Sequence, residues 1–213
     1  DRFSGRAYYV TSTLVMIETL VPFLLAFENR KPQARELVVL AVMCALAVAG
    51  RVAIPIPSFK AIFGIIMIAG IAFGPESGFL VGAISALASN FFYSQGPYTP
   101  WQMMAYGAGG MLAGFVFAEG RLPRKPVVMG IFGFLAVAFF VGPLLDTCSV
   151  FLVMSRISLK GAMAFYISGF PVNLRQAVAT AIVLLVLGKP LLEKLDRIKT
   201  KYGILDDEGR KEA

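Results

Sequence analysis

Apolar runs close to the thickness of a bilayer follow one another along nearly the whole chain, with short polar or charged connections between them. A helix needs about 20 predominantly apolar residues to cross the hydrocarbon core. The runs cover residues 8–27, 37–52, 61–73, 78–93, 100–118, 126–154 and 164–187. Only 15% of the residues are charged, whereas a soluble domain carries roughly a quarter. Because strand-like alternation is absent, the sequence predicts an all-α, polytopic membrane helical bundle rather than a barrel.

The positive charge of the chain indicates a membrane topology. The net charge is +7, but the lysines and arginines lie between and after the apolar runs, which does not indicate a nucleic-acid surface. Most of them fall in residues 28–36, in residues 119–125 and after residue 188. The positive-inside rule places these segments in the cytoplasm and the connections around Pro55, Gln95 and Ser158 outside. We therefore expect an N-terminal hydrophobic helix with a cytoplasmic linker (1–34), a membrane domain (35–202) and a charged cytoplasmic tail (203–213).

Polar and aromatic side chains gather where two of these apolar runs meet. Residues 78–114 read as two apolar helices joined by a short turn, and the cluster comprises Asn90, Tyr93, Gln95, Tyr98, Trp101 and Gln102. Apolar walls with a few polar groups are typical of a small-molecule pocket. An interfacial belt, in which Trp and Tyr lie at the level of the headgroups, would have the same composition. These residues alone favour neither interpretation.

A second group of polar candidates comes from the connection RVAIPIPSFK, residues 51–60. Pro55 and Pro57 cannot continue a helix and favour extended backbone. Non-helical backbone near a membrane is tolerated in water or buried in protein. Phe59 and Lys60 end this connection and could close the pocket, although Lys60 could also be an exposed lysine that reaches the interface.

The last two apolar runs contain charged and amide residues at membrane depth. Asp146 follows Gly142-Pro143, which indicates either a broken helix of the kind that forms substrate sites in transporters or a simple proline kink. Asn173 and Arg175 lie in the final run. Arg175 is costly in hydrocarbon unless it is paired, so it could pair with Asp146, face an aqueous pocket or anchor the helix at the interface.

A stripe of small residues marks one face of the run 37–52. Ala41, Ala45 and Ala49 are spaced four residues apart and therefore share a helix face. Small residues on a membrane helix form a groove that another helix can approach closely. We expect this face to contact a partner. Glycines on the run 100–118 predict similarly close packing inside the bundle, and they are Gly107, Gly109, Gly110 and Gly114.

Several function classes are excluded or weakened by what the sequence lacks. The absence of histidine excludes zinc proteases of the HExxH type and Ser-His proteases. No GxxxxGK[ST] loop of the kind that binds nucleotide phosphates is present. Cys44 and Cys148 lie inside apolar runs and predict small buried side chains without a disulfide. We expect no metal, cofactor or catalytic residue in this chain.

Taken together, these residues resemble the substrate-binding S components of energy-coupling factor (ECF) vitamin transporters. The resemblance covers about residues 35–202. It is carried by the alanine stripe, by Pro57-Ser58-Phe59-Lys60, by FGPESGF (73–79), and by SNFF (89–92) through GPYTPWQ (96–102). The last segment looks most like the branch that includes the cobalamin S component. The run 8–27 departs from the six-helix core of these proteins.

The resemblance implies a binding protein that depends on other subunits for energy. It implies capture of a vitamin outside the plasma membrane of a prokaryote, with cobalamin or a related compound as the first candidate. The run 37–52 would then dock on a transmembrane coupling subunit driven by two cytoplasmic ATPases that use ATP. A stand-alone secondary carrier would predict an inverted repeat, which the halves of the chain do not show. An intramembrane enzyme built on Glu18, Asp146 and Arg175 lacks a recognisable nucleophile, base or metal cluster.

Overall fold

The computed structural model describes residues 33–154 and 157–204, with a few positions nearer the N-terminus: Val10, Leu14, Ile17, Glu18, Leu20–Pro22, Leu25 and Glu28. Most of the predicted run 8–27 and most of the predicted tail 203–213 therefore lie outside the described residues, and their structural assignments stay predictions. Of the described N-terminal positions, Leu20 is buried against Phe79 and Ala83.

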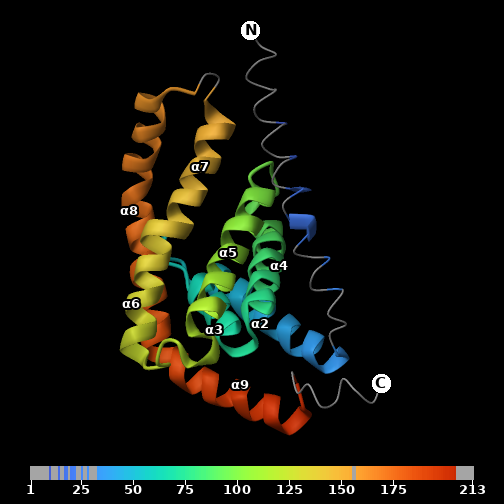
Figure 1. The fold of residues 1–213 in the computed structure, drawn as a ribbon. Coiled ribbons are helices and arrows are strands. Elements are labelled where there is room, and N and C mark those ends of the chain that lie inside the picture. Colours follow the sequence, from blue (N-terminus) through green and yellow to red (C-terminus); the bar gives the residue numbers. More distant parts are fainter. Residues whose placement is uncertain are drawn as a thin grey trace.

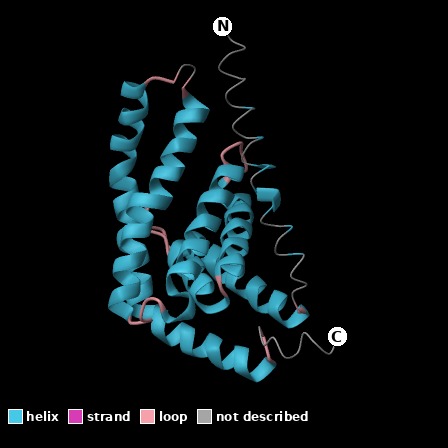
Figure 2. Cartoon of the chain, in the orientation of Figure 1, coloured by secondary structure: helices cyan, strands magenta, loops and turns pink. Residues whose placement is uncertain are grey.

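All regular structure among the described residues is helical, as the sequence predicts (Figure 2). Along the chain it comprises α2 (Ala34–Val52), α3 (Ile62–Phe73), α4 (Pro75–Tyr93), α5 (Thr99–Phe117), η1 (Ala118–Gly120), α6 (Pro126–Ala136), η2 (Val137–Val141), α7 (Gly142–Val153), α8 (Leu159–Val183), η3 (Leu184–Gly188) and α9 (Lys189–Tyr202). Two continuous helices, Pro126–Val153 and Leu159–Tyr202, are long and apolar enough to cross a membrane. The all-α fold class is confirmed.

Two short π-helical segments let prolines sit inside these long helices. η2 ends two residues before Pro143, and η3 ends two residues before Pro190. A proline lacks the amide hydrogen and its ring collides with the carbonyl four residues earlier, and a π-bulge relieves that conflict. The helical hydrogen bonding continues through Gly142, so the interpretation of this site as a broken helix is wrong.

The core is centred on α3. All twelve of its residues are buried, and it packs against α2, α4, α5 and α8. Three glycines allow α3, α4 and α5 to approach closely: a Cβ on Gly78 would lie 2.5 Å from the carbonyl oxygen of Gly110 and 2.7 Å from the Cα of Gly70. The predicted close packing of the glycines on α5 is confirmed. Figure 1 shows α6, α7 and α8 beside this group.

The amphipathic helix α9 crosses one end of the bundle (Figure 1). Its own Leu192 and Leu195 are buried against the bundle. The carbonyl oxygens in the last turn of α3 have no hydrogen-bond partner within the helix. Two cationic side chains donate hydrogen bonds to them instead. Lys199 Nζ donates to the Ala72 carbonyl oxygen at 2.7 Å, and Arg124 donates to the Ile71 carbonyl oxygen at 3.1 Å. Figure 1 shows the α4–α5 connection and the adjoining ends of α7 and α8 at the opposite end of the bundle from α9, and the predicted membrane topology stays a prediction.

Candidate functional site

A small polar cavity lies where α2, α3, α4, α5 and α8 meet the α2–α3 connection. Its volume is about 180 Å³, and its lining side chains are Arg51, Ser58, Lys60, Ile62, Phe63, Tyr93, Tyr106 and Gln176. Two cations, two phenol rings and one amide thus surround a space that also has an apolar wall from α3. Such a set of donors and aromatic faces can bind a planar compound with oxygen acceptors on its edge.

The α2–α3 connection that closes the cavity on one side is non-helical, as its prolines predict. Ser58 has a φ of 58°, in the left-handed backbone region that residues with a side chain rarely adopt. Lys60 Nζ donates to the carbonyl oxygen of Ile54 within the same connection, and it lies 6.0 Å from the centroid of the Tyr93 ring. Phe59 donates its backbone amide to the Ile56 carbonyl oxygen. Phe59 does not line the cavity.

Arg51, the penultimate residue of α2, organises the wall of the cavity. Its Nη1 donates to the Ser89 hydroxyl at 2.5 Å and to Asn90 Oδ1 at 2.9 Å, both on α4. The guanidinium carbon lies 4.9 Å from the ring centroid of Tyr93 and 5.6 Å from that of Tyr106. Tyr93 in turn donates its hydroxyl to the Arg51 carbonyl oxygen at 3.0 Å. The arginine therefore joins the ends of α2 and α4 and carries positive charge to the cavity.

The amide cluster of the α4–α5 connection is largely satisfied by itself. Asn90 is fully buried, and its Nδ2 donates to Gln102 Oε1 at 2.8 Å and to Thr99 Oγ1 at 3.2 Å. Thr99 donates to Gln95 Oε1 at 2.9 Å, and Gln95 Nε2 donates to the Leu87 carbonyl oxygen. These bonds close the hairpin. None of these side chains lines the cavity, although Asn90 reaches it through Arg51.

The two remaining aromatic candidates of this hairpin also lie away from the cavity. Trp101 is buried and stacks on Phe151 of α7, with the ring centroids 5.6 Å apart. Tyr98 donates its hydroxyl to the Ser94 carbonyl oxygen at 2.7 Å. Trp101 thus contributes to the contact between α5 and α7, and Tyr98 contributes to the turn.

The charged residues of the last two runs do not pair with each other. Asp146 Oδ2 accepts a hydrogen bond of 2.7 Å from Asn173, which joins α7 to α8. Arg175 is exposed, and its Nε donates to the Pro171 carbonyl oxygen of its own helix. Two residues along a helix correspond to about 200° of rotation, so Arg175 points away from the face that Asn173 presents to α7. Of the three alternatives for Arg175, the pairing with Asp146 is therefore not the one that the structure shows.

Of the site residues predicted from the sequence, only Lys60 and Tyr93 line the cavity. Their binding role stays a prediction, as does that of the other candidates. Sequence reasoning missed Arg51, Tyr106 and Gln176 as lining residues. The available signal was the position of each of these polar side chains inside or at the end of an apolar run, where burial requires partners.

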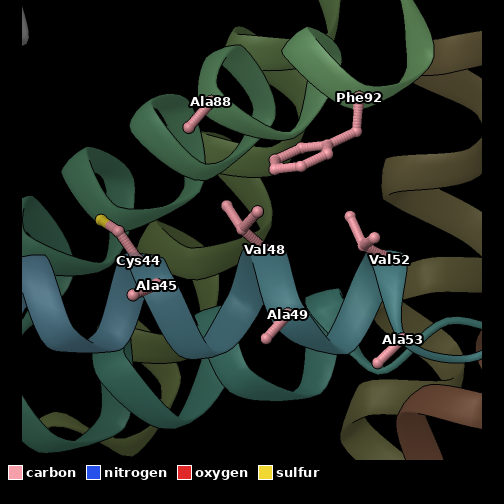
Figure 3. Close-up of a pocket in the computed structure, with 8 residues that line it drawn as sticks. All are labelled: Cys44, Ala45, Val48, Ala49, Val52, Ala53, Ala88 and Phe92. Atoms are coloured by element: carbon pink, nitrogen blue, oxygen red, sulfur yellow. The ribbon is translucent and has the colours of Figure 1, made fainter.

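The alanine face of α2 borders a second, apolar hollow of about 620 Å³, lined by Cys44, Ala45, Val48, Ala49, Val52, Ala53, Ala88 and Phe92. We call it the apolar groove. Val48 and Val52 of α2 face Ala88 and Phe92 of α4 across it (Figure 3). Ala41, Ala45 and Ala49 are all exposed, whereas Leu40, Met43 and Ala47 on the other face of α2 are buried. The face predicted to contact a partner is therefore available, and the contact itself stays a prediction.

Two helices long and apolar enough to cross a membrane, one of which supplies Gln176 to the polar cavity, indicate a helical membrane protein with room for a small ligand. A family model described as ECF-type riboflavin transporter, S component, matches residues 31–193, and the chain belongs to this family. It is thus a substrate-binding subunit of an ECF transporter, and it is not an enzyme. The match supports the resemblance to ECF S components but does not support the cobalamin branch specifically. Comparisons with curated proteins and with solved structures gave no match.

Proposed function

We propose that this chain spans the plasma membrane of a prokaryote several times and captures riboflavin or a closely related flavin from outside. The bound flavin would then enter through a coupling subunit driven by two cytoplasmic ATPases. The polar cavity is the observation that carries the proposal, because it combines cations, phenol rings and an amide in a chain whose family is described by riboflavin transport.

The chemistry of the cavity suits a flavin. The isoalloxazine ring is flat and aromatic and carries carbonyl acceptors along one edge, and the ribityl chain carries hydroxyls. Arg51 and Lys60 can donate to carbonyl oxygens, and the rings of Tyr93 and Tyr106 offer apolar faces for stacking. Gln176 can both donate and accept, which suits a group with neighbouring donors and acceptors or a hydroxyl.

The size of the cavity favours a flavin over cobalamin. Pockets for small molecules usually enclose about 300–1,000 Å³, and the cavity encloses about 180 Å³. A flavin therefore requires a modest opening, and we infer that the wall that moves is the α2–α3 connection ending at Lys60, because it is non-helical. Cobalamin is several times larger than a flavin and would require α2, α4 and α8 to separate. It stays the second candidate for the ligand.

The coupling half of the proposal is supported by α2. Ala45 and Ala49 are exposed beside the apolar groove, where a helix of a coupling subunit could pack closely. The sequence contains no phosphate-binding GxxxxGK[ST] loop, so the ATP would be bound and hydrolysed by the partner ATPases. Co-purification with a membrane coupling subunit and two ATPases tests this half. Uptake that persists without the ATPases would favour a secondary carrier instead.

The ligand is tested by titrating the purified protein in detergent with riboflavin. Stacking against tyrosine should quench flavin fluorescence, and native mass spectrometry should show one bound flavin. A Lys60→Met variant should bind about tenfold more weakly or worse, because a hydrogen bond to a charged group contributes about 1.5–3 kcal/mol. Lys160→Met, which removes an exposed lysine at the start of α8, is the matched control. A mass adduct with cobalamin and none with riboflavin would reverse the choice of ligand.

A further inference from the structure

The polar cavity and the apolar groove lie back to back at the ends of α2 and α4. On α2, Arg51 lines the cavity and the next residue, Val52, lines the groove. On α4, Tyr93 lines the cavity and the preceding residue, Phe92, lines the groove. One turn of each helix therefore forms the wall between the two spaces.

The same two turns are bonded to each other through one residue, Arg51. Arg51 Nη1 donates to the Ser89 hydroxyl and to Asn90 Oδ1, and the Arg51 carbonyl oxygen accepts from the Tyr93 hydroxyl. These three bonds fix the separation of the ends of α2 and α4. That separation also sets the distance across the groove between Val52 and Phe92, which face each other in Figure 3.

We propose that Arg51 is a positioning residue that couples occupancy of the polar cavity to the shape of the apolar groove, an inference that rests on the proposed function. A ligand with oxygen acceptors competes with Ser89 and Asn90 for the guanidinium donors, and its ring competes for the face of Tyr93. Each exchange changes how α2 is held to α4. The groove on which the coupling subunit docks thereby differs between the empty and the loaded protein.

Coupling of this kind requires that the ligand interact differently with two arrangements of the helices. Arg51 meets that requirement because its guanidinium can donate either to α4 or to the ligand, and its five N–H donors allow partial exchange. The connection from cavity to groove needs no long pathway, since Arg51 and Val52 are adjacent in the chain, as are Tyr93 and Phe92.

A nitroxide spin label on the exposed face of α2 tests the coupling. The label is attached at Ala49→Cys, which lines the groove, in a chain whose two native cysteines are replaced by alanine, and a second preparation carries it at Ala41→Cys, outside the groove. Ser89→Ala removes one acceptor of Arg51 without altering a cavity-lining residue. Ser85→Ala is the matched control, because Ser85 is equally buried on α4 and is not an acceptor of Arg51.

Without ligand, Ser89→Ala should narrow the spectral lines of the label at position 49, because the label becomes more mobile. Ser85→Ala should leave them unchanged, and the label at position 41 should respond to neither. Saturating riboflavin should change the spectrum at position 49, and Ser89→Ala should reduce that change. Two results would overturn the proposal. One is that the labelled parent and the labelled Ser89→Ala variant give equal spectra at position 49. The other is that riboflavin changes the spectrum of Ser89→Ala as much as that of the parent. If riboflavin fluorescence is not quenched at all, the proposed ligand fails, and the ligand-free comparison still decides the role of Arg51.

Discussion

Replacing Gly110 with alanine tests whether α4 and α5 pack through direct backbone contact. The new Cβ would lie 2.7 Å from the carbonyl carbon of Gly78 and still nearer to its oxygen, so α4 and α5 would have to separate. The neighbouring Gly109 is the control. A Cβ there would meet only a side-chain methyl of Val141, at 2.9 Å, and a side chain can move where a backbone cannot.

The expected magnitude follows from two opposing effects. Overpacking a core costs about 1–3 kcal/mol, and a clash with backbone atoms belongs at the upper end, about 3 kcal/mol. Alanine in place of glycine within a helix recovers about 1 kcal/mol. Gly110→Ala should therefore lose about 2 kcal/mol of stability. For Gly109→Ala the shift of one valine costs about 1 kcal/mol, which the helix propensity offsets.

The assay is thermal unfolding of both variants and the parent in one detergent, followed by tryptophan fluorescence and by the recovery of monodisperse protein. A change of 1 kcal/mol shifts Tm by about 2–4 °C in a chain of this size. Gly110→Ala should thus melt about 4–8 °C lower, and Gly109→Ala within about 2 °C of the parent. Equal melting temperatures for Gly109→Ala and Gly110→Ala would refute the argument that α4 and α5 are in backbone contact.

Three further outcomes are expected. Ala45→Leu should fill the apolar groove and remove most of the co-purified coupling subunit, while riboflavin binding persists. Val38→Leu, at an exposed position of α2 outside the groove, should change neither the co-purification nor the binding. Lys199→Met should lose about 1.5–3 kcal/mol of stability because it removes the hydrogen bond to the end of α3. Lys201→Met, which removes an exposed lysine, should leave the stability unchanged, and thermal unfolding measures both. Trp101→Ala should lower the free energy of unfolding by about 3–5 kcal/mol because it leaves a void against α7. Trp101→Phe should lower it much less. A small effect of Trp101→Ala would mean that the indole ring faces an open pocket.

The features predicted correctly from the sequence are those that local chemistry decides. For the runs between residues 37 and 154 the predicted bounds lie within three residues of the observed helix bounds, since a chain in lipid must satisfy its backbone internally. Pro55 and Pro57 keep the α2–α3 connection non-helical because their effect on the backbone is intrinsic. The spacing of Ala41, Ala45 and Ala49 places them on one face of a helix whatever surrounds it, and that face is exposed.

The features that sequence reasoning missed depend on which helix faces which. Arg51 lies at the end of an apolar run, a position equally typical of an interfacial anchor, and its acceptors Ser89 and Asn90 belong to another helix. In the α4–α5 hairpin, amides such as Gln95 and Gln102 bond within the hairpin, and composition cannot distinguish such bonds from bonds to a ligand. Gln176 borders the cavity only because α8 turns that face toward α2 and α3.

The geometry of α2 explains how one helix can serve both a ligand and a partner. An α-helix turns about 100° per residue, so Arg51 lies about 200° around the axis from Ala49. The guanidinium and the alanine face therefore point to nearly opposite sides, one into the polar cavity and the other toward the exposed surface of the protein. Any rotation of α2 that withdraws Arg51 from Ser89 turns the alanine face through the same angle. If α2 moves as a rigid helix, its proposed ligand contact and its proposed docking face move together, because they lie on opposite sides of the same helix.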